Sequence, residues 1–330
     1  MARLLLGNRF RRIAARFPVI QHTLWLFEAA FLGSLLLLAR LLPVDAATEA
    51  GRKILRWIGP RQAKHRKIKE NLRLAFPDKT PAEIETIARG VWGNVGALLS
   101  EYAHLEEICR RGPGERLQTV VHGEIDAFRH GGKAGIFVAA HLANWELCAP
   151  AVRRYTPSVT GIYTPLQNPW LDRILAKRRE ALGCGLVKRD ESMRSLIREL
   201  QAGRSIGMVI DQRVDSGRPI PMFGIDKMTT LVPARLALRH GYELIPIRAE
   251  RLEGARFRIT FYPPVHADDP EAPEIERAEQ MMARVNGLFE QWIRERPQDW
   301  FCSKRRFPKG AAAGTPVETS RPGRAASGGQ

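Results

Sequence analysis

From about residue 116 onward, short apolar runs alternate with segments of helical pattern, and this alternation constrains the fold more than any other feature. The expected strands cover residues 134–140, 158–163, 205–210, 243–249 and 256–261. The expected helices cover roughly residues 82–110, 144–154, 168–182, 192–202, 231–240 and 273–296. Strands that alternate with helices form parallel or mixed sheets with helices on their faces. The sequence therefore predicts an α/β fold with a mixed, mainly parallel sheet covered by helices.

A second constraint is the apolar run at residues 23–43, which follows a basic arm rich in arginine. A membrane-spanning helix needs about 20 mostly apolar residues. The charges in this run, Glu28 and Arg40, lie near its ends, where a charged side chain costs less than at the bilayer centre. We expect residues 1–43 to form an arm and a membrane helix that spans or is deeply embedded. A buried core helix and a cleaved signal peptide are the alternatives.

The rest of the chain divides into a folded domain and a tail. Residues 44–308 are expected to form one domain, and residues 309–330 a disordered tail because they are rich in Ala, Gly, Ser and Pro. Thr80 and Glu83 form a capping signal for the helix that follows. The four cysteines are far apart and form no C-x-x-C pair, which argues against a zinc site and fits a reducing compartment.

The charge balance is strongly basic, with 52 Lys and Arg against 35 Asp and Glu and a formal net charge of +17. Residues 52–73 hold a basic block with one acid, Glu70. A basic block directly after an apolar segment is typical of the cytoplasmic side of a membrane helix and can bind anionic lipid. A solvated helix face is the alternative. Nucleic acid is disfavoured as a partner, because no zinc-finger spacing or RNP-type aromatic motif accompanies the charge.

The chemistry-bearing candidate is a histidine followed five positions later by a glutamate. The chain lacks the G-x-S-x-G, G-x-x-x-x-G-K-[ST], G-x-G-x-x-G and H-E-x-x-H motifs, which disfavours serine hydrolases, P-loop and Rossmann enzymes and zincins. Three histidines have a glutamate at this spacing: His65, His141 and His266. Only His141 directly follows an expected buried strand, at the end where α/β sheets place their sites.

His141 and Glu146 would not share a face of a regular helix, because five positions leave their side chains about 140° apart. They could meet if His141 lies in a turn and Asn144 caps a helix that carries Glu146. Glu146 could then orient one imidazole nitrogen while the other accepts a proton from a hydroxyl. Free N–H groups at that helix start could hold a developing oxyanion. A structural histidine is the alternative interpretation.

The sequence resembles the late acyltransferases of lipid A biosynthesis, whose members carry an H-x-x-x-x-[D/E] motif. The resemblance covers roughly residues 20–308. It rests on the segments 65–77 (ending in Asn71-Leu-Arg-Leu-Ala-Phe-Pro77), 140–146, 163–172 with Arg178-Arg179, 210–212, 222–224, 229–230, 296–300 and 304–307. One position departs from the pattern, because Thr164 stands where many relatives have arginine.

The resemblance implies a glycerolipid-acyltransferase-like fold and an enzyme of the bacterial inner membrane whose catalytic domain, residues 44–308, faces the cytoplasm. It would transfer a fatty acyl group from acyl carrier protein to a hydroxyl of a lipid A precursor, without a cofactor or metal. His141 would be the general base and Glu146 its partner. Arg179 would lie near the phosphorylated substrate or the thioester oxygen. Asp211 matches a family acid without an assigned role, and with Asn144 these residues are the substrate-binding candidates.

Other functions remain open at this stage. The chain could acylate another glycolipid, such as a mannolipid, from acyl-CoA. It could be a catalytically inactive membrane protein that binds polyanions by charge, or a peripheral hydrolase. A basic protein would attract both an acidic carrier protein and an anionic lipid, which fits the acyltransferase interpretation.

Overall fold

The computed structural model describes residues 17–128, 133–188, 192–308 and 310–311. Within these residues, seven strands form one sheet in the order β1-β9-β8-β2-β5-β3-β4, and two more form a separate hairpin. Every neighbouring pair in the large sheet is parallel except β8 and β9, so the predicted mixed, mainly parallel sheet is confirmed. The basic arm up to residue 16 and most of the expected tail lie outside the described residues.

The five expected strands are all present. They are β2 (Ile136–Ala139), β3 (Val159–Tyr163), β5 (Ser205–Val209), β8 (Leu244–Arg251) and β9 (Phe257–Phe261). The sequence reading missed the two edge strands and the hairpin, which are β1 (Leu117–Val121), β4 (Gly185–Lys188), β6 (Arg218–Met222) and β7 (Ile225–Thr229). The three central strands β2, β5 and β8 are largely buried because helices cover both faces of the sheet.

The expected helical segments are helical at least in part. The N-terminal helices are α2 (Pro18–Arg40), α3 (Val44–Ile58), α4 (Ala63–Ala75), α5 (Pro81–Glu101) and α6 (Leu105–Cys109). Those of the second half are α7 (Cys148–Val152), α8 (Pro169–Arg179), α9 (Ser192–Gln201), α10 (Val232–His240) and α11 (Glu274–Glu295). Helices α3 and α4 were not predicted, and the expected helix at 144–154 is a 3-10 turn followed by the short α7. Thr80 and Glu83 form the predicted capping box of α5. The expected helix at 82–110 is divided between α5 and α6 by a turn at residues 102–104.

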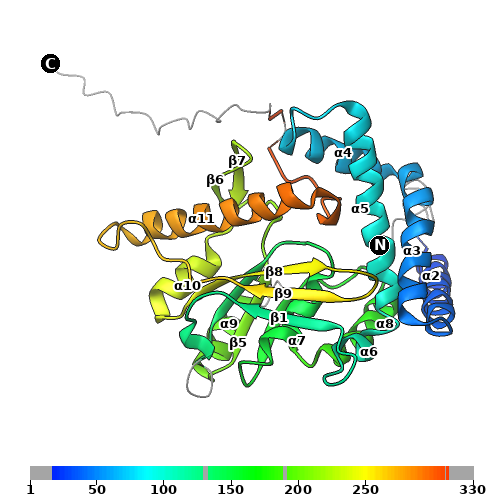
Figure 1. Ribbon diagram of the computed structural model, residues 1–330, viewed down its shortest axis with the longest axis horizontal. Coiled ribbons are helices and arrows are strands. Elements are labelled where there is room, and N and C mark those ends of the chain that lie inside the picture. Colours follow the sequence, from blue (N-terminus) through cyan, green and yellow to red (C-terminus); the bar gives the residue numbers. More distant parts are fainter. Residues whose placement is uncertain (1–16, 129–132, 189–191, 309, 312–330) are drawn as a thin grey trace.

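Two apolar clusters form the core, one on each face of the sheet. Side chains alternate between the faces along a strand, so Val138 of β2 packs in the cluster with α11, and Phe137 packs in the cluster with α7 and α8. Figure 1 shows α11 on one side of the sheet and α7 on the other, and α9 packs in the cluster of α11 through Leu196 and Leu200. This arrangement leaves the carboxyl ends of β2 and β5 side by side.

Helix α2 lies against the folded domain along its length. Its buried and half-buried positions recur with helical spacing, at Gln21, Leu24, Trp25, Glu28, Ala29, Leu32, Gly33, Leu36 and Ala39. Asn168, at the start of α8, donates to the Trp25 carbonyl at 3.0 Å and to the Glu28 carboxylate at 3.2 Å. At the other end, Arg40 donates to the Ala103 carbonyl at 2.8 Å.

Asn168 provides a test of this docking. Its side-chain oxygen also caps α8 by accepting from the backbone of Trp170 and Leu171. Asn168→Asp keeps the cap but places a second carboxylate beside Glu28, which is 5% exposed. The pair would share a proton in the folded state, so the pKa of one carboxyl group is raised on folding and stability falls as pH rises.

We therefore expect Asn168→Asp to lower the unfolding temperature in detergent more at about pH 8 than at about pH 5. Asn168→Ser is the matched control, because serine retains a cap without adding a charge. The decrease in unfolding temperature of this variant should not depend on pH. Equal losses for Asn168→Asp at both pH values would contradict the contact with Glu28.

Candidate active site

Two polar side chains follow neighbouring strands at the same edge of the sheet. His141 lies two residues after β2, and Asp211 lies two residues after β5. Strands β2 and β5 are parallel neighbours, with Ala139 opposite Val209. The carboxyl ends of parallel strands are where open α/β sheets place their ligand sites. The topology thus brings together two residues that are 70 positions apart in the chain.

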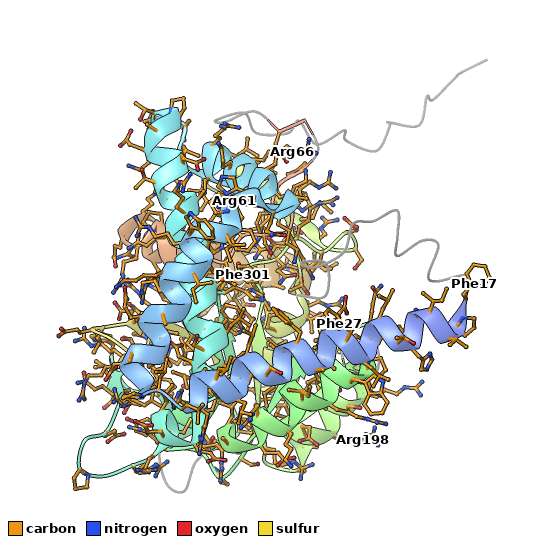
Figure 2. All side chains as sticks on the ribbon, turned by 90° about the vertical axis from the view of Figure 1, so that its right-hand side faces the viewer. Phe17, Phe27, Arg61, Arg66, Arg198 and Phe301 are labelled. Atoms are coloured by element: carbon orange, nitrogen blue, oxygen red, sulfur yellow. The ribbon has the colours of Figure 1, made fainter. Side chains whose placement is uncertain are left out.

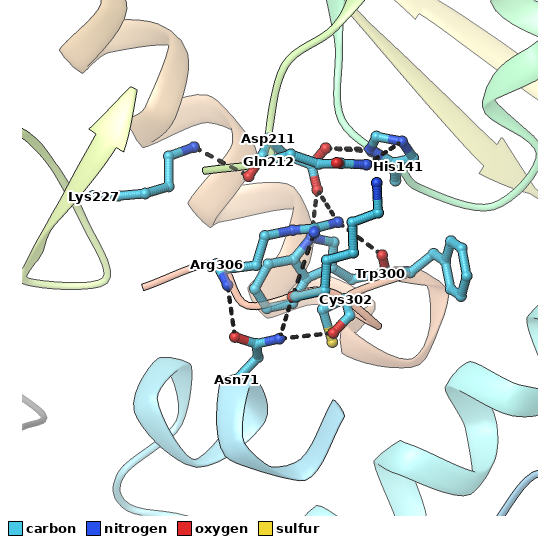
Figure 3. Close-up of polar contacts among 10 residues, drawn as sticks. Asn71, His141, Asp211, Gln212, Lys227, Trp300, Cys302 and Arg306 are labelled. Atoms are coloured by element: carbon cyan, nitrogen blue, oxygen red, sulfur yellow. Dashed lines mark hydrogen bonds and ion pairs between the residues drawn. The ribbon is translucent and has the colours of Figure 1, made fainter. Parts of the chain in front are cut away.

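The Asp211 carboxylate is the centre of a hydrogen-bond network that is shown in Figure 3. One oxygen accepts from His141 Nδ1 and, at 3.2 Å, from the His141 backbone N–H. The other oxygen accepts from Trp300 Nε1 at 2.9 Å and forms an ion pair with Arg306 at 3.1 Å. Asp211 and Trp300 are fully buried, and Arg306 is 1% exposed. A buried carboxylate needs such partners, because burying an unpaired charge is very costly.

Electrostatics keep Asp211 ionised. Burial acts to raise the pKa of Asp211, but the charge of Arg306 and the hydrogen bonds from His141 and Trp300 more than offset it and hold the pKa well below its ordinary value. Lys227 of β7 lies nearby and donates to the backbone carbonyl of Asp211 at 3.2 Å. Burial lowers the pKa of Lys227 to about 8. A small change around the ammonium group would therefore alter the fraction that is charged near neutral pH.

The partners of the imidazole define its protonation. Because Asp211 can only accept, Nδ1 of His141 carries the hydrogen of this bond. The Gln212 amide Nε2 donates to His141 Nε2 at 3.0 Å, so Nε2 is the acceptor nitrogen. His141 is therefore arranged as a neutral base whose lone pair lies on Nε2. The neighbouring carboxylate would stabilise the imidazolium after proton transfer.

The expected contact between His141 and Glu146 is corrected by the structure. The Glu146 carboxylate accepts from Arg179 at 3.0 Å and 2.6 Å and from the Tyr102 hydroxyl at 2.5 Å. Glu146 lies on a 3-10 turn, Trp145–Leu147, rather than on a regular helix. From that turn its side chain reaches Tyr102, directly after α5, and Arg179 of α8, whereas Asp211 holds the imidazole nitrogen that Glu146 was expected to orient.

Glu146, Arg179 and Tyr102 form a partly buried charged cluster. Burial acts to lower the pKa of Arg179, but the Glu146 carboxylate more than offsets it and raises the pKa above its ordinary value. Burial raises the pKa of Tyr102 well above its ordinary value, and Glu146 raises it further. The hydroxyl therefore stays protonated and donates, and the guanidinium stays charged.

Asn144 occupies the N-cap position of the turn, but its side chain makes no capping hydrogen bond. It is fully buried and donates to Glu101 at 2.9 Å. The expected oxyanion site at the start of a long helix is not formed, because His141 is followed by the 3-10 turn and the five-residue helix α7. Asn144 thus supports the loop from beneath and does not line the cavity described next.

A cavity of about 570 Å³ opens beside the Asp211 network and the Glu146–Arg179–Tyr102 cluster. Its polar lining includes His141, Gln212, Glu146, Arg179 and Tyr102. Most of the remaining lining is apolar and comes from α5, α7, α8 and the sheet, including Leu98, Val152, Ile162, Leu175 and Leu186. Few convergent polar groups on an apolar cavity are typical of a ligand site. Among the described residues, no cluster of three or more His, Cys, Asp or Glu side chains could hold a metal ion.

Sequence reasoning missed several side chains that build this site. Gln212, Trp300 and Arg306 lie in motifs quoted above, but the sequence suggested no role for them. Tyr102 and Lys227 carried no signal at all. Asp211 was singled out by the resemblance alone, although it directly follows an expected strand, as His141 does. That position becomes a specific signal only once the order of strands in the sheet is known.

Comparison with known proteins gives a family match over most of the chain. A sequence model described as "Bacterial lipid A biosynthesis acyltransferase" matches residues 18–309. A search of curated proteins found no match. Among solved structures, the chain matches the crystal structure of a 1-acyl-sn-glycerophosphate acyltransferase from Thermotoga maritima. The identity is 13% and the TM-score 0.36, over 76% of this chain and 96% of that one.

The corrected partner of Glu146 can be tested by stability. Arg179 is 19% and Glu146 11% exposed at the side chain, and removing one partner of a buried ion pair costs about 3 kcal/mol. Arg179→Met should therefore destabilise the protein, and adding Glu146→Gln should restore part of the loss, as measured by unfolding in denaturant. His141→Ala and Glu146→Gln should be additive within about 0.5 kcal/mol. A coupling energy between His141 and Glu146 as large as that between Arg179 and Glu146 would contradict the structure.

Proposed function

Because the chain belongs to the family of bacterial lipid A biosynthesis acyltransferases, we propose that it transfers a fatty acyl group from acyl carrier protein to a hydroxyl of a lipid A precursor. The observation that carries the proposal is the His141–Asp211 pair on an apolar cavity. The pair supplies a base, and the cavity offers apolar walls for an acyl chain. Acyl transfer to a hydroxyl requires both.

In the proposed reaction, Nε2 of His141 accepts the proton of the acceptor hydroxyl, which displaces the amide of Gln212. The hydroxyl oxygen attacks the thioester carbonyl carbon, so a carbon–oxygen bond forms and the carbon–sulfur bond breaks. The imidazolium returns the proton to the leaving thiolate. Asp211 accepts from Nδ1 throughout and stabilises the imidazolium. No protein nucleophile takes part, because the acceptor hydroxyl itself attacks.

Arg179 is proposed to bind the thioester oxygen. Glu146 and Tyr102 accept three of its hydrogen bonds through Nε and Nη2. A guanidinium has five N–H donors, and those on Nη1 have no hydrogen-bond partner within the described part of the chain, so they are proposed to meet a ligand in the cavity. The role of Glu146 would then be to fix Arg179 in the cavity rather than to orient His141. A fixed donor placed where negative charge develops stabilises the transition state.

The basic block supports acidic partners. It falls on α3, α4 and the turn between them, but part of its charge is neutralised within the protein. Lys67 pairs with Glu70 at 2.5 Å, and Lys69 pairs with Glu85 at 2.8 Å. We propose that the remaining positive charge attracts acyl carrier protein and anionic lipid, with an association rate that falls as salt rises.

The proposed location is the cytoplasmic face of the bacterial inner membrane, with α2 lying in the plane of the bilayer. Within the described part of the chain, α2 is the helix that is long and apolar enough to cross a membrane. It is docked on the domain along its length, however. A spanning orientation would carry charged residues of α8, such as Arg173 and Lys177, into hydrocarbon at a cost of several kcal/mol each.

The outward side of α2 fits a lipid surface. It exposes large apolar side chains, namely Val19, Ile20, Leu26, Phe27, Phe31, Leu35, Leu37 and Leu38. Figure 2 looks onto this side, where α2 runs across the domain and Phe27 is labelled. On the neighbouring helix α3, Trp57 is 65% exposed, and the Arg61 guanidinium lies 4.4 Å above its ring. Tryptophan with arginine suits the level of the lipid head groups.

The reaction is tested by mass spectrometry of the lipid product. We expect the lipid A precursor to gain one acyl group when acyl carrier protein thioester is the donor. Acyl-CoA with a mannolipid serves as the alternative pair, and product from that pair alone would assign another glycolipid. If no donor and acceptor pair gives a product, the protein would be assigned as a catalytically inactive membrane protein that binds polyanions. If free fatty acid alone is released, the protein would be assigned as a hydrolase.

His141→Ala should lower kcat by about 10²–10⁴-fold, the usual effect of removing a general base. Asp211→Asn should lower kcat as well, because it removes the charge that stabilises the imidazolium. The control is His266→Ala, since His266 is exposed and also has a glutamate five positions later. A folded His141→Ala protein with a near-normal transfer rate would rule out the assigned base.

The orientation of α2 is tested with a cleavable tag at the N-terminus and protease added outside spheroplasts. If α2 lies in the plane, the tag stays on the cytoplasmic side and is cut only after lysis. A spanning α2 would expose the tag to the protease in intact spheroplasts. A tag at the C-terminus is the control and should be protected until lysis in either case.

A further inference from the structure

The polypeptide after α11 holds both members of the catalytic pair. We call residues 299–307 the C-terminal strap. Its backbone binds the loop of His141 from two sides, because Phe301 N donates to the His141 carbonyl at 2.9 Å and Ala143 N donates to the Asp299 carbonyl at 3.0 Å. Its side chains Trp300 and Arg306 hold the Asp211 carboxylate.

The strap from Phe301 onward has no regular secondary structure, so its backbone polar groups need other partners. Asn71, on the inner side of α4, supplies them. Its amide nitrogen donates to the carbonyls of Cys302 and Lys304, both at 2.7 Å, and its oxygen accepts from Arg306 N at 2.9 Å. Asn71 is 2% exposed, and Figure 3 shows it on the far side of the strap from His141.

We propose that Asn71 is a positioning residue for the reaction, which fixes the strap so that Arg306 and Trp300 meet Asp211 and Asp211 in turn holds His141. The inference rests on the proposed function and extends it, because Asn71 does not line the cavity. Both the donors and the acceptor of its amide are used by three alternate residues of the strap, which holds the backbone at Cys302, at Lys304 and at Arg306 itself. Helix α4 thereby becomes part of the support of the active site.

A displaced strap has a predictable electrostatic consequence. The Asp211 carboxyl group faces His141 from the loop after β2 and Arg306 with Trp300 from the strap, and Lys227 of β7 donates to the backbone carbonyl of the same residue. If Arg306 moves away, burial is less well offset and the pKa of Asp211 rises. Since Asp211 must be ionised to accept from Nδ1, activity would be lost at a higher pH on acidification.

The experiment measures kcat and KM against pH for the full-length enzyme carrying Asn71→Ala, Arg306→Gln or both. We expect Asn71→Ala to lower kcat by roughly 10–100-fold, the loss found for residues that orient the ligands of catalytic metals, while KM changes little. The acid limb of the kcat profile should move to higher pH in both single variants. The double variant should be little worse than Arg306→Gln alone, since both substitutions disturb one contact.

The matched control is Asn286→Ala on α11. Asn286 is 1% exposed and, like Asn71, uses its amide for two buried contacts, to the Pro221 carbonyl and the Thr229 hydroxyl, both at 3.2 Å. It should lose stability without moving the pH profile, and its effect on kcat should be independent of Arg306→Gln. If Asn71→Ala does not fold, Asn71→Ser retains a short donor and is measured in its place.

The outcomes separate the two proposals. Suppose that the wild-type enzyme is active and His141→Ala is inactive. A folded Asn71 variant with normal kcat and an unchanged pH profile would then overturn the positioning role alone. The positioning role would also be overturned if Asn71→Ala lowered kcat without moving the acid limb and its effect added fully to that of Arg306→Gln. The loss of activity would then reflect a general structural defect rather than a disturbed contact with Asp211. Wild-type enzyme without transfer activity would overturn the proposed function itself.

Discussion

The buried carboxylate of Asp211 is the constraint on which the rest of the site depends. A fully buried negative charge is tolerated only when it is paired and hydrogen-bonded. Here the pairing comes from a histidine after β2 and from Trp300 and Arg306 near the C-terminus. Because these groups converge on one carboxylate, the sheet edge, the strap and the imidazole have a single mutual arrangement. The neutral base and its orientation both follow from it.

The cluster of Glu146, Arg179 and Tyr102 separates the two residues of the H-x-x-x-x-E motif. Glu146 binds Arg179 and Tyr102, whereas His141 binds Asp211, so the two residues of the H-x-x-x-x-E pattern belong to different clusters on one cavity. In the proposed reaction, His141 moves the proton and Arg179 meets the negative charge on the substrate. A base with an orienting acid and a fixed cation on the same cavity would suit acyl transfer.

The sequence predicted the central strands and most helices, because apolar runs such as 134–140 and caps such as Thr80 with Glu83 are local signals. It missed the edge strand β1, which is only partly buried, and the β6–β7 hairpin, where Pro219 and Pro221 argue against a strand. It found His141 by its place after an expected strand, and Asp211 only through the resemblance to a family. Their pairing depends on strand order, and that order arises from long-range packing rather than from any local pattern.

The most direct test of the central claim is proton and nitrogen NMR of the His141 imidazole in the intact enzyme. The account predicts a strongly hydrogen-bonded Nδ1 proton in the wild type. That signal should be lost in Asp211→Asn and retained in Glu146→Gln. Loss of the signal in Glu146→Gln with retention in Asp211→Asn would contradict the account, because Glu146 would then be the residue that holds the imidazole.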